Sequence, residues 1–257
     1  MGNDRLAKAV QLSESMEQYD GYARNLLSYK ELIAVILKAV GHEFREMSIK
    51  EIKDSIDADP EIETGRIVGG GVCYAATLLS GQLEKEIESG DYDQLKKVYS
   101  IWICMNAPEK DANTVTEYRI LPKDVYGRLG EYGRYDLVSV IMIRLPNHEP
   151  EEAAQEPVEK MLAALYTIFK AQKAPEEKCK ELKYRYGIQV STEFEKEVTT
   201  MCNFSEAILE QGIEQGIEQG DLRAIRKMLE RGYALEEIAQ IYEKELIERV
   251  LKETTKV

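Results

Sequence analysis

The run from Lys96 to Asn106 constrains the fold of this 257-residue chain more than any other segment. It reads Lys-Lys-Val-Tyr-Ser-Ile-Trp-Ile-Cys-Met-Asn, contains the only tryptophan, Trp102, and is followed by Ala107-Pro108. Successive β-branched, aromatic and sulfur-containing residues that end at a proline are typical of a strand buried on both faces. We therefore predict a strand over residues 98–105, with Trp102 buried at the centre of a sheet.

The rest of the chain predicts two more strands and many helices. Residues 115–121 alternate in polarity and residues 137–145 are densely apolar, with glycine-rich turns between them, so each is expected to form a strand. Helical spacing or capping signals mark the segments 22–40 (one helix or two short ones), 49–56, 72–88, 158–171, 175–186 and 191 onward. The expected fold is a mixed α/β core with about three strands flanked by helices, followed by a helical tail.

Composition restricts the class of protein. The chain is 44% hydrophobic, enough for a core, and its net charge of −13 argues against a protein that grips nucleic acid over its whole surface. The four cysteines form no Cys-x-x-Cys pair, which indicates reduced, buried thiols. Because no segment approaches the length of an apolar membrane span and the N-terminus has no hydrophobic signal region, we expect a cytoplasmic protein without a membrane partner.

An internal repeat marks the tail. Gly-Ile-Glu-Gln occurs at Gly212 and again at Gly216, and Gly220 follows. On a helix, a four-residue period places these glycines in one slowly drifting stripe with Ile213 and Ile217 beside it. Each glycine costs about 1 kcal/mol in a helix interior, so close approach of a second helix would offset the loss. The pattern predicts a helix over 205–219 and a homo-oligomer formed through the tail, with a flexible linker as the alternative.

The last part of the tail has a different pattern. Asp221 is expected to cap a helix over 222–231, which Gly232 ends, and a further helix starts near Tyr233. This arrangement resembles the first half of a helix-turn-helix. Acidic residues outnumber basic ones from Phe204 to Val257, so helical packing is the favoured interpretation and DNA reading the alternative.

Four segments resemble one family. They are KKVYSIWICMNAP, MCNFSEAILEQGIEQGIEQG, DGYARNLLSYKELIAVILK and RIVGGGVCYAATLLSGQ. Together they resemble the bacterial PD-(D/E)XK nuclease family transposases, relatives of the recombination-promoting nucleases. The resemblance implies a restriction-endonuclease-like domain over 1–203, a helical tail over 204–257, and DNA cleavage that requires Mg²⁺ in intact members.

The resemblance is interrupted where the family performs its chemistry. Family members hold Mg²⁺ with an Asp on one strand and a Glu-x-Gln or Glu-x-Lys triplet on the next, because carboxylates suit this ion and residues two apart on a strand face the same side. Here the chain passes from Ile56 to Arg66 within a few residues, too few for two strands. The nuclease domain is therefore expected to be incomplete between about 57 and 66, with the catalytic residues unknown and neither a metal site nor a cofactor in this chain.

The other residues that could replace the missing catalytic acids are poor candidates. The triplets Glu51-Ile52-Lys53 and Glu181-Leu182-Lys183 have Glu-x-Lys spacing, but both fall in predicted helices, where residues two apart do not face together. Several acids cluster on an irregular segment, which favours a solvated loop over a cation site, and the three glycines before the 72–88 helix favour a hinge over a phosphate cradle. The residues concerned are Asp57, Asp59, Glu61, Glu63, Gly69, Gly70 and Gly71, and His42 and His148 stand alone.

Two functions follow from these observations. The first is a PD-(D/E)XK nuclease or transposase relative whose catalysis is lost, with weak DNA or partner binding remaining. The second is a non-enzymatic interaction protein that oligomerises through its tail and regulates full-length relatives. The first depends on the resemblance, and the second on the glycine repeat.

Overall fold

A computed structural model describes residues 18–56, 68–86, 92–133, 135–150 and 156–254. The described chain divides into two compact units, residues 16–201 and a unit that contains residues 202–257. No helix within the described ranges is long and apolar enough to cross a membrane. The fold is mixed α/β, as predicted, with a three-stranded sheet and a majority of helical residues.

The sheet lies in the first unit. Strands β1 (Val98–Cys104), β2 (Thr114–Arg119) and β3 (Val138–Arg144) confirm the three predicted strands, with ends that differ by a few residues. The strand order is β1-β3-β2, with β1 parallel and β2 antiparallel to β3. The central strand is therefore β3, whose residues from Ser139 to Ile143 are all buried.

The prediction that β1 is buried on both faces at the centre of the sheet is wrong. β1 is an edge strand, and only Val98 of its residues is fully buried. Trp102 is half-buried, and its indole Nε1 donates a hydrogen bond to Ser100 Oγ at 2.9 Å. Because β1 has a neighbouring strand on one side only, solvent reaches its side chains from the open edge, whatever their hydrophobicity.

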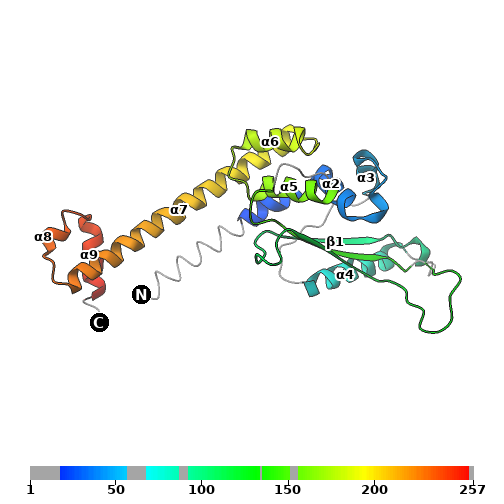
Figure 1. The fold of residues 1–257 in the computed structure, drawn as a ribbon, viewed down its shortest axis with the longest axis horizontal. Coiled ribbons are helices and arrows are strands. Elements are labelled where there is room, and N and C mark those ends of the chain that lie inside the picture. The colour runs from blue at the N-terminus through cyan, green and yellow to red at the C-terminus, as the bar shows by residue number, and fades with distance from the viewer. Residues whose placement is uncertain (1–17, 57–67, 87–91, 134, 151–155, 255–257) are drawn as a thin grey trace. The chain divides into compact units, whose positions relative to one another are not determined.

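Helices cover both faces of the sheet (Figure 1). On one face, Tyr99 and Ile101 of β1 pack against a cluster from α2 (Lys30–Val40) and α3 (Ile49–Ser55) that includes Leu37 and Ile52. On the other face, α4 (Val68–Glu86) packs on β1 and β3 through Ala75. The two faces of β1 thus belong to separate apolar clusters.

The three glycines of 69–71 lie inside α4, so the expected hinge before this helix is wrong. A Cβ atom on Gly71 would lie 2.6 Å from Trp102 Nε1 and 2.7 Å from Val140 Cγ1, and one on Gly70 would lie 3.3 Å from the Trp102 ring. The glycines therefore let the helix backbone approach the indole, a packing role that outweighs their low helix propensity.

The remaining helices of this unit agree with their sequence signals. Residues 18–27 and α2 form two short helices rather than one, and Ser48 and Glu51 form the expected capping box of α3. α5 (Pro157–Phe169) and α6 (Pro175–Tyr184) both begin at a proline, and short 3₁₀ turns occur at His42–Phe44 and Tyr92–Gln94. α5 is buried along most of its length and contacts α2 and α6.

One long helix, α7 (Thr192–Glu230), contains the glycine repeat and confirms that 205–219 is helical. It continues through Asp221, so the expected new helix start at this residue is wrong, whereas Gly232, with φ of 82°, does follow the helix end. α8 (Leu235–Ile238) and α9 (Lys244–Thr254) follow. Ile225, Ile238, Ile247 and Val250 form the small buried core of this second unit.

Candidate functional site

The first Glu-x-Lys triplet, Glu51-Ile52-Lys53, lies on α3 as predicted. The Glu51 carboxylate accepts hydrogen bonds from the Ser48 backbone N–H and hydroxyl, both at 2.7 Å, and so caps its helix. Lys53 instead forms an ion pair with Glu31 of α2. The two charged groups therefore serve different structural contacts and do not converge.

The second triplet, Glu181-Leu182-Lys183, lies on α6. Glu181 shares the Lys173 ammonium with Glu149, at 2.7 and 2.6 Å, and these hydrogen bonds raise the pKa of Lys173. Lys183 lies over the Tyr184 ring, 5.4 Å from its centroid. Neither triplet places an acid and its lysine at one point.

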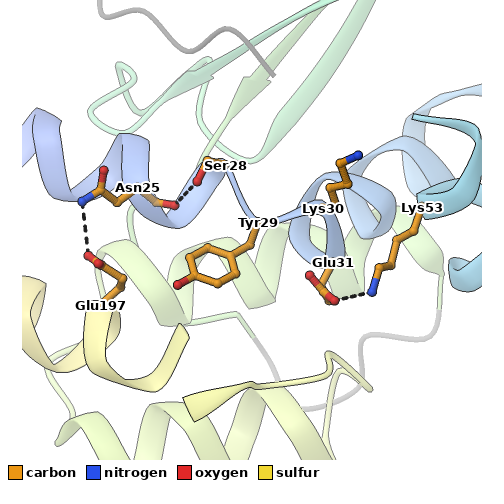
Figure 2. A pocket seen from close by; sticks show the side chains of 7 residues that line it. All are labelled: Asn25, Ser28, Tyr29, Lys30, Glu31, Lys53 and Glu197. Carbon is orange, nitrogen blue, oxygen red and sulfur yellow. Dashed lines mark hydrogen bonds and ion pairs between the residues drawn. The ribbon is translucent and has the colours of Figure 1, made fainter. Parts of the chain in front are cut away.

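Lys53 lines an open pocket with a volume of about 610 Å³. Figure 2 shows the pocket wall, which combines the turn between the first two helices with α3 and the start of α7. Tyr29 lies between the Glu31–Lys53 ion pair and the Asn25 side chain, which donates to Glu197 at 3.4 Å. The pocket is thus lined mainly by polar groups that already bond to one another.

Two groups in this pocket, Glu31 and Tyr29, have pKa values shifted away from neutral pH. Burial would raise the pKa of Glu31, but the hydrogen bond from Lys53, a backbone hydrogen bond and the Lys53 charge together outweigh it and lower the pKa. Burial and the nearby Glu197 raise the pKa of the Tyr29 hydroxyl. Glu31 and Tyr29 are therefore both shifted away from proton exchange near neutral pH.

A second polar cluster lies where the parallel strands begin, and sequence reasoning missed it. Lys97, just before β1, bonds to Asp136, just before β3, at 2.8 Å and to Glu43 at 2.9 Å. Its ammonium also lies 5.0 Å from the centroid of the Tyr99 ring. The only available sequence signal was that Lys97 and Asp136 each precede a strand, since parallel strands begin at the same end of a sheet.

Charge compensation dominates this cluster. Burial would raise the pKa of Glu43, but contacts with Tyr99 and Lys97 lower it to about 2. The Tyr99 hydroxyl is buried and makes no well-aligned hydrogen bond within the described chain, yet it lies close enough to Glu43 that burial and this carboxylate raise its pKa. The carboxylates of Glu43 and Asp136 both bind the Lys97 ammonium. The cluster therefore links the starts of β1 and β3 to the turn at His42–Phe44.

The described strands of the sheet contain few acidic residues. β1 and β3 contain no acidic residue, and β2 contains only Glu117. Glu117 accepts a hydrogen bond from Ser139 at 2.7 Å and lies 4.0 Å from Arg119, two residues along the same strand. This Glu-x-Arg triplet is the nearest approach to the family pattern in the described sheet, and its Glu117 also lines a second pocket of about 420 Å³.

The other candidate residues lie apart. His42 is exposed and pairs with Glu43 at 2.6 Å, and His148 is exposed, 3.6 Å from Glu109. Asp57, Asp59, Glu61 and Glu63 lie outside the described residues. None of the four cysteines forms a disulfide, but only Cys179 and Cys202 are buried, so the expectation of buried thiols is wrong for the exposed Cys73 and the half-buried Cys104.

Comparison of the chain with protein families, curated proteins and solved structures finds no match. Within the described residues, no group of three or more His, Cys, Asp or Glu side chains is arranged to hold a metal ion. In the geometry of the candidate site, the charged residues form paired structural contacts.

Proposed function

We propose that this chain is a non-cleaving relative of the PD-(D/E)XK nuclease family transposases, with a reduced restriction-endonuclease-like core, and that it acts in the cytoplasm by associating with other macromolecules. The sequence resemblance supports the family. A sheet with helices on both faces and a parallel β1–β3 pair is compatible with such a core. The net charge of −13 favours protein partners over DNA, which would be bound weakly at most.

One observation supports the proposed loss of DNA cleavage. Cleavage by this family's chemistry needs two carboxylates on adjacent strands, the second followed two residues later by Gln or Lys, whereas Glu117 is the single acid in the described sheet. The Glu-x-Lys triplets lie on helices, and their partners are Ser48, Glu31 and Lys173. These contacts give each charged group a structural role in place of a shared catalytic one.

A plasmid-nicking assay tests this proposal. We expect no conversion of supercoiled plasmid to nicked or linear DNA with Mg²⁺ or Mn²⁺, under conditions in which a relative that keeps the Asp and Glu-x-Lys strands cleaves. Nicking that EDTA abolishes, and that persists in a variant with Glu51→Gln and Glu181→Gln, would contradict the proposal. The further variant Glu117→Gln would then show whether the one acid of the sheet is responsible.

A second candidate function, self-association through the tail, is favoured by the exposed face of α7. Leu209, Ile213 and Ile217 are 53%, 53% and 61% exposed, which is unusual for three large apolar residues on successive turns. Within the described residues, a Cβ atom on Gly212, Gly216 or Gly220 would meet nothing within 4 Å beyond its own helix backbone. A second helix laid along this face would cover the apolar side chains at close range.

A further inference from the structure

The outer edge of β1 combines unpaired backbone groups with an uncharged surface. Val98 N–H donates to Leu137 at 2.8 Å, and Cys104 C=O accepts from Leu145 at 3.1 Å, so the even-numbered residues of β1 direct their backbone groups toward β3. Tyr99, Ile101 and Ile103 therefore direct theirs outward. Within the described chain, these outward groups have no backbone hydrogen-bond partner.

The two edges of the sheet differ in their protection. β2, the opposite edge strand, carries Glu117 and Arg119, and charges of this kind discourage further strand pairing. β1 has the sequence Val-Tyr-Ser-Ile-Trp-Ile-Cys, without a charge, a proline or a glycine. The edge of β1 thus keeps the features that permit another strand to pair.

Exposed apolar residues of α4 extend this surface. Tyr74 and Leu78, one helical turn apart, are 43% and 37% exposed, and the Tyr74 ring centroid lies 6.0 Å from that of Trp102 on β1. α4 therefore presents apolar side chains beside the edge strand, on the face of the sheet that it covers. A partner strand that carried a similar helix would cover both surfaces together.

We propose that β1 pairs antiparallel with β1 of a second copy of this chain, about a two-fold axis through Ile101. In that register, Tyr99 lies opposite Ile103 of the other copy, an aromatic–β-branched pair that stabilises sheets. The lysines that precede β1 lie opposite Met105 and Asn106, so like charges are separated. The strand is self-complementary in hydrogen bonding, side-chain size and charge, as a symmetric contact requires.

The same symmetry brings the two copies of α4 to one face of the joined sheet. The exposed residues of α4 then face the equivalent residues of the second copy, which removes apolar surface from water on both. A short extended peptide from another protein would pair with the edge but would leave this helical surface uncovered. The observations therefore favour a second copy as the occupant.

Site-specific cross-linking tests the register. In a Cys73→Ser background, which removes the exposed native thiol, the two sulfurs of an Ile101→Cys variant would meet at the axis, where hydrogen-bonded residues lie about 5.5 Å apart between Cα atoms. The matched variant Ile103→Cys places its thiols about 14 Å apart at about 3.4 Å per residue. We expect disulfide-linked dimer to form at least tenfold faster with Ile101→Cys; equal rates would overturn the proposal.

A second pair of variants tests the backbone contact. Ile103→Pro removes an outward N–H that has no backbone partner in the described part of the chain, while Ile103→Ala removes similar side-chain area and keeps the N–H. With Ile103→Pro in the Ile101→Cys, Cys73→Ser background, dimer formation should fall at least tenfold, and with Ile103→Ala it should persist. Unchanged cross-linking in a folded Ile103→Pro protein would refute strand pairing. If Ile103→Pro does not fold, hydrogen exchange of the parent protein replaces this test. The Ile101 amide should become more protected as the protein concentration rises, and a lack of such protection overturns the proposal.

Discussion

Gly71 is the residue whose replacement should reveal most about the core. A methyl group at this position would lie 2.6 Å from the indole of Trp102 and 2.7 Å from Val140, closer than atoms can pack. We expect Gly71→Ala to lower the free energy of unfolding by about 1–3 kcal/mol, because overpacking outweighs the gain in helix propensity. Urea unfolding followed by circular dichroism measures the change.

Gly81 provides the matched control for this experiment. It lies in the same helix, α4, but a Cβ atom there would meet nothing within 4 Å. Gly81→Ala should therefore raise the stability by up to about 1 kcal/mol through propensity alone. If both alanine variants shift the unfolding midpoint in the same direction, the close helix–sheet contact at Trp102 does not exist in solution.

The lowered pKa of Glu43 predicts that the stability of the protein depends on pH. Its pKa falls from 4.5 to about 2 in the folded protein through Tyr99 and Lys97, against the effect of burial. A lowered folded-state pKa stabilises the protein above the unfolded-state pKa, and this contribution is lost as the pH falls from about 4.5 to about 2. Since the side chain is 34% exposed, screening reduces the contribution to about 1 kcal/mol.

Urea unfolding across pH checks this prediction. Glu43→Gln should be less stable than the parent by about 1 kcal/mol at pH 7, and the two proteins should converge near pH 2, where Glu43 itself is protonated. Glu46→Gln, an exposed site in the same segment, serves as the control. A gap between Glu43→Gln and the parent that stays constant from pH 7 to pH 2 would show that the carboxylate contributes no ionic stabilisation.

At the scale of single residues, the sequence identified types of residue but not their neighbours. The hydrophobicity of Trp102 marked it as a core residue, yet its burial depends on strand order, which no local pattern encodes. The glycines of 69–71 likewise indicated a hinge from their propensities. Their role depends on an indole that lies some thirty residues further along the chain.

Among the secondary-structure elements, α7 carries the prediction of a tail interface. Gly212→Leu with Gly216→Leu fills the open glycine stripe and should abolish association through the tail, although leucine favours the helix more than glycine does. Analytical ultracentrifugation of the full chain measures the mass. Because β1 pairing is a separate contact, the expected result is the loss of one association step, with Ile101→Cys cross-linking retained.

The control for the tail places equal bulk on the other side of the helix. Glu210→Leu with Glu214→Leu has the same four-residue spacing but lies about 160° around the helix from the glycines. This variant should keep the mass of the parent. A glycine-stripe variant that also keeps the parent mass would leave the repeat as a spacer without an interface.

Secondary structure was the most predictable level of this protein. Each strand and most helices have local causes that can be read from the chain, such as the alternation in β2, the prolines that begin α5 and α6, and the capping box of α3. Asp221 shows the limit of such signals. A good capping residue was expected to start a helix, but the preceding segment was already helical and α7 continued through it.

Across the whole molecule, the candidate site was predictable only in part. That Glu51 and Lys53 would not face together followed from helix periodicity. Their actual partners, Ser48 and Glu31, depend on the packing of α3 against α2 and could be foreseen only for the cap. The Lys97 cluster joins three segments distant in sequence, so tertiary structure alone reveals it.

The division into two compact units predicts two unfolding transitions. The second unit has a small buried core in which Ile225, Ile238, Ile247 and Val250 pack together, and Arg249 forms an ion pair with Glu218. A core of this size stabilises a unit only marginally, so we expect it to melt first. Ile238→Ala should cost about 2–5 kcal/mol and shift only the first transition in differential scanning calorimetry.

Leu165→Ala provides the reciprocal variant, since Leu165 is completely buried in α5 of the first unit. It should lower the second transition and leave the first in place, because each substitution opens a cavity in only one of the cores. Circular dichroism should then assign the early loss of helix to residues of the tail. A single transition that both substitutions lower by equal amounts would mean that the continuous helix α7 couples the units into one cooperative structure.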